Sequence, residues 1–82
     1  MSIHAEMTVA SEMPQSFFEL GLAHSIGSAG SVNLIEAHKW FNIAAAQGDR
    51  MAARHREELA EEMTKEEIAA ALRAAREFLR RH

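Results

Sequence analysis

The sequence predicts an all-α protein of about four helices arranged as antiparallel helical hairpins. Its 82 residues are rich in Ala, Glu, Leu and Arg, which are strong helix formers, and contain a single Pro. Apolar residues recur at the three- and four-residue spacing of amphipathic helices, and glycines or capping residues separate the segments in which they recur. A chain of this length forms one small domain with a marginal core.

Cysteine content and charge narrow the class of protein. The chain has no Cys, so neither a disulfide nor cysteine-ligated zinc can stabilise its core. The net charge is −3, and residues 50–82 carry eight basic against seven acidic side chains, unlike a strongly basic nucleic-acid-binding domain. No apolar stretch is long enough to span a membrane, and no signal-peptide pattern is present. We therefore expect a cytoplasmic protein, either of bacterial type or from the cytosol more generally.

The N-terminal segment shows no clear hydrophobic period. We expect residues 1–12 to form a flexible arm, because chain ends fray unless they are held by packing. A single helical domain is expected over residues 13–82. Its first helix should begin at Ser11 or Met13, with Pro14 in the first turn, where the missing N–H costs nothing.

The first helix should bury one face. Phe17, Leu20 and His24 follow the i, i+3, i+7 spacing of such a face. Gly21 lies in the interior of this helix, where it costs about 0.8–1 kcal/mol relative to Ala, so we expect another helix to approach closely there. The glycine-bearing residues 27–31 should form the loop that follows.

The second helix has recognisable ends. Asn33 is expected to cap it, with Glu36 completing a pair that resembles a capping box. Gly48 should end it in the position just past the C-cap. Of the two adjacent aromatic residues, we expect Trp40 to lie inside the hairpin core and Phe41 to lie near its edge.

Two further helices complete the chain. Asp49 can cap a third helix from Arg50 to about Met63, and Thr64 with Glu67 forms a capping box for a fourth helix that ends near residue 81. The short connections predict that successive helices run antiparallel. The apolar seam of the fourth helix is expected at Ile68, Leu72, Ala75 and Leu79.

Small residues, one Leu and one Trp stand at fixed spacing across the first two helices: Leu20, Gly21, Gly27, Ala37, Trp40, Ala44, Ala45, Gly48 and Ala52. With these positions, residues 16–52 resemble a Sel-one-like repeat, a relative of the tetratricopeptide repeat. The chain departs from the repeat pattern in its loop and at His24, Asn33 and Glu36, where the family has Tyr, Asp and Lys.

The resemblance implies a short α-solenoid-like unit. Residues 13–49 would be one full repeat hairpin, and residues 50–82 a degenerate capping hairpin. Such repeats serve as scaffolds for macromolecular assembly. The resemblance therefore implies a non-enzymatic protein–protein interaction module, either an adaptor or a small accessory subunit of a larger complex. Because repeat arrays need about three units for stability, either the cap is unusually effective or a partner, another protein or a second copy, completes the fold.

No catalytic, cofactor or metal site is expected. No two of the five His stand at the i, i+3 or i+4 spacing that places two imidazoles on one helix face for a metal. The Gly27–Gly30 loop matches neither a dinucleotide-binding nor a P-loop fingerprint. The acidic side chains at 57, 58, 61, 62, 66 and 67 follow helical spacing, which is typical of a solvated face.

The candidate partner contacts are three aromatic and three basic residues: Phe17, Phe18, Phe41, Arg73, Arg76 and Arg80. Four Phe are more than one small core can absorb, and exposed apolar side chains mark partner surfaces. The arginines stand at i, i+3 and i+7 and support an alternative function, a small regulatory protein that contacts nucleic acid. The absence of interleaved aromatic residues and the acidic run nearby make nucleic acid the less favoured partner.

Overall fold

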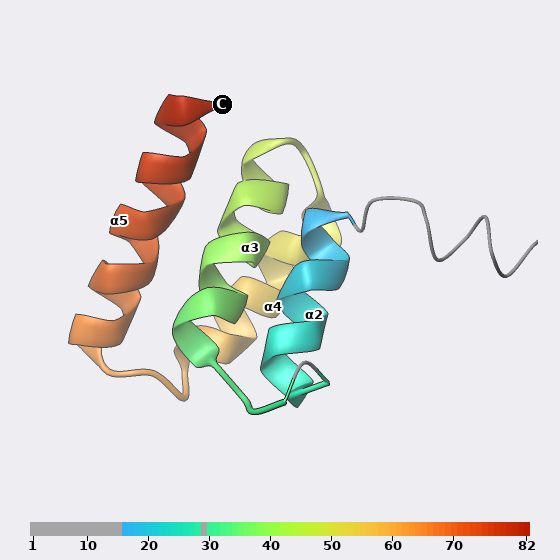
Figure 1. The fold of residues 1–82 in the computed structure, drawn as a ribbon, viewed down its shortest axis with the longest axis vertical. Helices are drawn as coiled ribbons and strands as arrows, with labels where there is room; N and C mark the ends of the chain where they lie inside the picture. The colour runs from blue at the N-terminus through green and yellow to red at the C-terminus, as the bar shows by residue number, and fades with distance from the viewer. Residues whose placement is uncertain (1–15, 29) are drawn as a thin grey trace, which may run out of the picture.

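The computed structural model describes residues 16–28 and 30–82, which form four helices and no strand (Figure 1). The protein is all-α, as expected. The helices are α2 (Phe17–Ile26), α3 (Leu34–Ala46), α4 (Arg50–Ala60) and α5 (Lys65–Arg81). The expected flexible arm at residues 1–12 lies outside the described residues. The expected start of the first helix at Ser11 or Met13 was wrong: the helix that carries Phe17 and Gly21 begins at Phe17, because Ser16 is extended and caps it.

Helix α2 begins with a capping box that was not among the expected caps. Ser16 is extended, and its Oγ accepts a hydrogen bond of 3.0 Å from the backbone N–H of Glu19. The Glu19 carboxylate in turn accepts one of 3.2 Å from the backbone N–H of Ser16. Two N–H groups that have no partner inside the helix are thereby satisfied, so this helix starts at Phe17.

Helix α3 is capped by Asn33 as expected, but only half of the expected pair forms. Asn33 Oδ1 accepts a 3.0 Å hydrogen bond from the N–H of Glu36. The reciprocal bond is not made, because the N–H of Asn33 already donates to the carbonyl of His24 at 3.0 Å. The Glu36 carboxylate accepts instead from Nε1 of Trp40, at 3.1 Å.

The start of α4 agrees with expectation, but its end does not. Gly48 adopts a φ of 101° before α4, and Asp49 Oδ1 accepts from the N–H of Ala52 at 3.1 Å. The helix ends at Ala60, before the expected end near Met63. Residues 61–63 continue as turns with hydrogen bonds to the third preceding carbonyl, the tighter pattern common at helix C-termini.

Helix α5 has the expected bounds. Thr64 Oγ1 accepts from the N–H of Glu67 at 3.0 Å, and the Glu67 carboxylate accepts from the N–H of Thr64 at 2.9 Å, which completes the predicted capping box. Acidic side chains occupy its first turn and basic ones its last turn, an order that suits the helix dipole.

Helix α3 is the centre of the packing. It packs extensively against α2, α4 and α5, whereas the other helix pairs touch only marginally. Figure 1 shows α3 and α5 running in one direction and α2 and α4 in the other, so successive helices alternate as expected. However, α4 and α5 do not close on each other as the expected capping hairpin, because α5 packs against α3.

The core is small and rich in Ala. The buried apolar residues are Ala37, Phe41, Ile43, Ala44, Ala52, Ala71 and Ala75. Among large side chains, only Phe41 and Ile43 are fully buried in the described part of the chain. Small side chains let helix backbones approach closely, but they bury little apolar area each. The fold therefore depends on a few large side chains.

The expected placement of Trp40 and Phe41 was wrong. Phe41 is 1% exposed and packs with Ala37, Ala44 and Ala52, whereas Trp40 is half-buried. The reason lies on α2, where the absence of a side chain at Gly21 leaves room for the Phe41 ring. Phe41 is therefore a core residue and not a partner contact.

The expected seam of α5 was also partly wrong. Ala71 and Ala75 are fully buried, whereas Leu72 and Leu79 are 38% and 39% exposed. Because α5 packs substantially on α3 alone, only one narrow face of the helix is covered. The two leucines lie on its uncovered flank.

Candidate interaction surface

Three aromatic rings from three different helices meet at one edge of the fold. Phe17 of α2 stacks on Trp40 of α3, with ring centroids 5.5 Å apart and planes at 15°. Phe78 of α5 meets Phe17 at 5.5 Å and Trp40 at 5.2 Å, both edge to face. These are favourable geometries for aromatic pairs. We call Phe17, Trp40 and Phe78 the aromatic trio; all three are half-buried.

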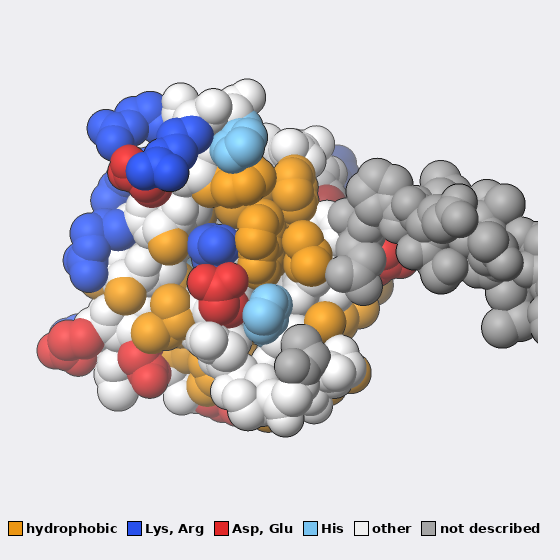
Figure 2. Space-filling model, in the orientation of Figure 1, with side chains coloured by type: hydrophobic (Ala, Val, Ile, Leu, Met, Phe, Trp, Pro, Cys, Tyr) orange, Lys and Arg blue, Asp and Glu red, His pale blue; other side chains and the backbone are white. Residues whose placement is uncertain are grey.

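Polar groups border the aromatic trio. Lys39 Nζ lies 4.2 Å from the Trp40 ring centroid and 3.4 Å from Glu36 Oε1, the oxygen that also accepts from the indole. The imidazole of His82 stacks on Phe78 with centroids 4.3 Å apart. On the face where α2, α3 and α5 are visible, Figure 2 shows hydrophobic side chains gathered at the centre, with charged side chains and His around them. An apolar centre with a polar border is the usual make-up of a protein interface.

A second aromatic group lies deeper. Phe18 of α2, Phe41 of α3 and His55 of α4 have ring centroids 5.1–5.8 Å apart. Phe18 is half-buried and packs on the core that contains Phe41. This group joins α4 to the α2–α3 pair, so its contribution is to stability rather than to an accessible surface.

Beside this deeper group lies an open groove of about 460 Å³. Val32, Leu34 and Leu59 contribute apolar lining, and Glu58 and Glu62 contribute carboxylates. The groove is wide and open, and Ser25, Phe41 and His55 complete its lining. In the described part of the chain, no group of three or more His, Asp or Glu side chains is placed to hold a metal ion.

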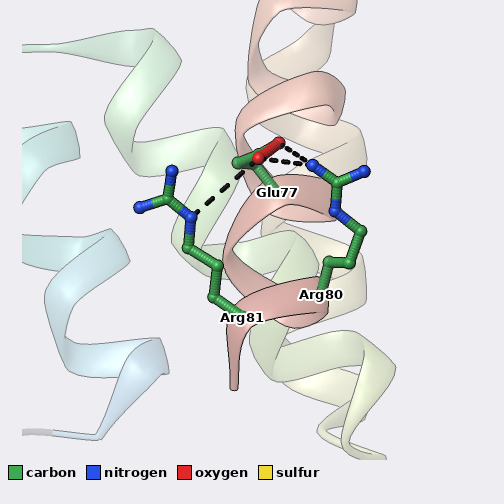
Figure 3. Close-up of polar contacts among 3 residues, drawn as sticks. All are labelled: Glu77, Arg80 and Arg81. Atoms are coloured by element: carbon green, nitrogen blue, oxygen red, sulfur yellow. Dashed lines mark hydrogen bonds and ion pairs between the residues drawn. The ribbon is translucent and has the colours of Figure 1, made fainter.

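The arginine stripe of α5 consists of Arg73, Arg76 and Arg80. It is exposed, and Glu77 lies among its arginines. Arg73, Arg76 and Arg80 line a shallow groove of about 270 Å³ together with Glu77. Figure 3 shows Glu77 between Arg80 and Arg81: Nη2 of Arg80 donates to both carboxylate oxygens at 2.8 and 2.6 Å, and Nε of Arg81 lies at 3.9 Å. Among the described residues, Arg73 and Arg76 form no ion pair, so within this stripe they are the two cations available to an anion.

His38 is a buried polar residue that was not among the expected functional residues. It is 3% exposed, and its Nδ1 has no hydrogen-bond partner. Burial lowers the pKa of His38 below the usual 6.5, and the charge of Arg56 lowers it further. Arg56 of α4 donates from Nη1 to Asn42 Oδ1 on α3 at 2.6 Å. The burial of His38 could have been inferred from its position on the inner side of α3, one residue after Ala37 and three before Phe41.

Of the positions that carry the repeat resemblance, all but Gly48 are half-buried or buried. Gly27 has a φ of 78° and Gly48 one of 101°, both in the left-handed region that favours glycine. Leu20, Trp40 and Ala45 are half-buried. The buried positions are Gly21, Ala37, Ala44 and Ala52.

Of the expected contact residues, the structure places only Phe17 in the aromatic trio. The other two members of the trio, Trp40 and Phe78, were not among the expected contact residues. Their meeting depends on α5 docking against α3, which no local pattern reveals.

None of the described helices is both long and apolar enough to cross a bilayer.

No family model, no curated protein and no solved structure matches the chain, so these comparisons do not assign it to a family. The resemblance of residues 16–52 to a Sel-one-like repeat stays a prediction from its residues.

Proposed function

We propose that this chain is a non-enzymatic protein–protein interaction module, an adaptor or small accessory subunit, and that its partner docks on the aromatic trio. The observation that carries the proposal is the convergence of Phe17, Trp40 and Phe78 from three helices on a half-exposed surface. The cytoplasmic location expected from the sequence is part of the same proposal.

The chemistry of the aromatic trio supports docking of a protein. Trp is among the residues most enriched where interfaces gain most of their affinity, and aromatic side chains bury much area at small entropic cost. Here the rings already pack on one another, and the Trp40 indole is held by Glu36 at 3.1 Å. Little order would have to be imposed on binding, which favours affinity.

The surroundings of the aromatic trio also support docking of a protein. Lys39 and Glu36 provide a polar pair at its border, where charged groups orient a partner and suppress wrong ones. A partner with an apolar patch and polar groups that match Lys39 and Glu36 would complement this surface.

Site-specific photo-crosslinking tests the proposal. A photoreactive amino acid replaces His82, whose ring stacks on Phe78, and in a control chain it replaces Ile26, which is 72% exposed at the other end of α2. Irradiation in the source cells should yield one discrete protein adduct from position 82 and none of that mass from position 26. No discrete adduct from position 82, or the same adduct from both positions, would overturn the proposal.

The partner identified in this way then allows a matched comparison. Phe17→Asp removes a ring of the trio at the first residue of α2, where an acidic side chain suits the helix dipole. Ile26→Asp adds the same charge at the last residue of α2. The affinity of the purified partner should fall more than about tenfold for Phe17→Asp and stay unchanged for Ile26→Asp.

A second candidate function rests on the two unpaired arginines. Contact with nucleic acid is favoured by the exposure of Arg73 and Arg76 and disfavoured by Glu77, which occupies the neighbouring Arg80 and Arg81. Two cations supply little of the phosphate neutralisation on which such binding depends.

A further inference from the structure

An apolar groove with an acidic side lies between α2 and α4. This is the groove of about 460 Å³ described above, and α3 contributes Leu34 and Phe41 to its lining. Both α2 and α4 pack on α3 but touch each other only marginally, so a slot is left between them. Val32, in the loop before α3, also lines the slot and is 56% exposed. No residue of the aromatic trio lines this groove, so it is a separate surface.

The acidic side of the groove is placed where its own helix does not stabilise it. Residues 57–62 carry four Glu and no Lys or Arg, and α4 ends at Ala60. The C-terminal end of a helix is the negative pole of its dipole, where carboxylates are unfavourable and cations are favourable. Helix α5 has the favourable order, with basic side chains in its last turn. Of the four glutamates, Glu58 and Glu62 line the groove.

No cation of the described chain neutralises this pair of carboxylates. Among the described residues, neither Glu58 nor Glu62 forms an ion pair, and no Lys or Arg lines the groove. Arg54 and Lys65 stand about one turn away on either side and leave both carboxylates unpaired. A cation brought by a partner would therefore interact favourably with two carboxylates and with the end of the helix at once.

We propose that this groove binds a basic amphipathic helix of another protein, whose apolar side chains pack on Leu34 and Leu59 while its Lys or Arg side chains meet Glu58 and Glu62. Charge complementarity selects the basic partner. The described residues form no strand, so an extended segment finds no sheet edge to pair with, whereas a helix needs only a groove for its apolar face. This inference goes beyond the proposed docking on the aromatic trio and does not depend on it.

The N-terminal segment of the chain itself is a poor match for the groove. Residues 1–15 carry Glu6 and Glu12 and no Lys or Arg, so they lack the positive charge that complements Glu58 and Glu62.

Titration of the purified full chain with a synthetic peptide tests the proposal. The probe is a fluorescent peptide of about 16 residues, long enough to form a helix, with Leu on one face, Lys beside that face and Ala elsewhere. A control peptide has Glu at every Lys position. Fluorescence anisotropy at low salt should show saturable binding of the Lys peptide, which weakens as salt is added, and no binding of the Glu peptide.

Two matched pairs of substitutions separate the groove from the general negative charge of the chain. Glu58→Gln with Glu62→Gln should weaken binding of the Lys peptide about fivefold or more. Glu57→Gln with Glu61→Gln removes the same charge from residues that do not line the groove and should weaken binding less than about twofold. All four residues are exposed, so the fold should be retained in both variants. In the wild type, the amide NMR signals that the peptide shifts should centre on the groove and not on the aromatic trio.

Four outcomes would overturn the proposal: equal affinity for the two peptides, equal loss in the two glutamate pairs, NMR shifts centred outside the groove, or occupation of the groove by this chain. Sedimentation without peptide tests the last of these, because self-association that Glu58→Gln with Glu62→Gln abolishes would assign the groove to a second copy. Shifts of the amide signals of residues 1–15 in that variant, without peptide, would assign it to the N-terminal segment. None of these variants alters the aromatic trio, so failure here is distinct from failure of the proposed function.

Discussion

The ring of Phe41 fills the space that a side chain at Gly21 would need. A Cβ built on Gly21 would lie 2.5 Å from both Cδ1 and Cε1 of Phe41, closer than real Cβ contacts come. The glycine in the interior of α2 is thereby explained. Its helix-propensity cost is offset by the burial of an aromatic ring from α3.

Gly21→Ala should therefore destabilise the protein although Ala is the better helix former. The gain of about 0.8–1 kcal/mol in propensity is outweighed by overpacking, which typically costs about 1–3 kcal/mol. We expect urea unfolding to show a net loss of about 1 kcal/mol. In a Phe41→Leu background the same substitution should be neutral or stabilising, because the smaller side chain leaves room. A stabilising effect in the wild-type background would contradict this account.

Phe41 and Trp40 should differ sharply in their contribution to the free energy of unfolding. Phe41→Ala removes a fully buried ring and should cost about 3–5 kcal/mol, a large part of the stability of so small a chain. Trp40→Ala removes a half-buried ring and should cost less. Thermal unfolding followed by circular dichroism gives the ranking, and it would be contradicted if Trp40→Ala were the more damaging of the two.

His38 should make stability depend on pH just below neutrality. Its pKa in the folded state is lowered by burial and by Arg56, whereas in the unfolded chain it stays near 6.5. The folded state thus binds fewer protons between these two values. Stability is full above about pH 6.5 and falls as the pH drops from there to the folded pKa.

The control for this prediction is His38→Leu, which keeps an apolar volume at the buried position and cannot titrate. The slope of the unfolding free energy between about pH 6.5 and 5 should be flatter in this variant than in the wild type. All other ionisable groups are the same in the two proteins, so the difference between the slopes reports His38 alone. Equal slopes in the two proteins would show that His38 does not control the effect.

Glu77 should matter for anion binding and little for folding. Its pairs with Arg80 and Arg81 are exposed, and such pairs contribute about 0.2–1 kcal/mol at most. Glu77→Gln releases both arginines, so retention on heparin should rise while the free energy of unfolding changes by less than about 1 kcal/mol.

Variants of Glu77 and of the neighbouring arginines test the second candidate function, contact with nucleic acid. Arg73→Ala with Arg76→Ala should abolish any weak binding to duplex or single-stranded nucleic acid, with a steep dependence on salt before the substitution. If the wild type shows no binding at low salt while Glu77→Gln binds, the stripe is inhibited by its own carboxylate. Tight binding by the wild type would instead favour the nucleic-acid function over the protein-docking one.

What the sequence determined by itself is the local part of the fold. The all-α class, the caps at Asn33, Asp49 and Thr64, and the glycine turn at Gly48 could be predicted because each depends on residues within a few positions of one another. The need for a close neighbour at Gly21 could be predicted too. The capping box of Ser16 was equally local and was present in the sequence as Ser-x-x-Glu.

What only the tertiary structure decided is which helix face meets which neighbour. In Ala-rich helices several faces are almost equally apolar, so the pattern along α3 does not distinguish Phe41 inside from Trp40 inside. The docking of α5 on α3 decided that Ala71 and Ala75 are covered and Leu72 is not. It also created the aromatic trio, because rings far apart along the chain meet only when three helices are packed together.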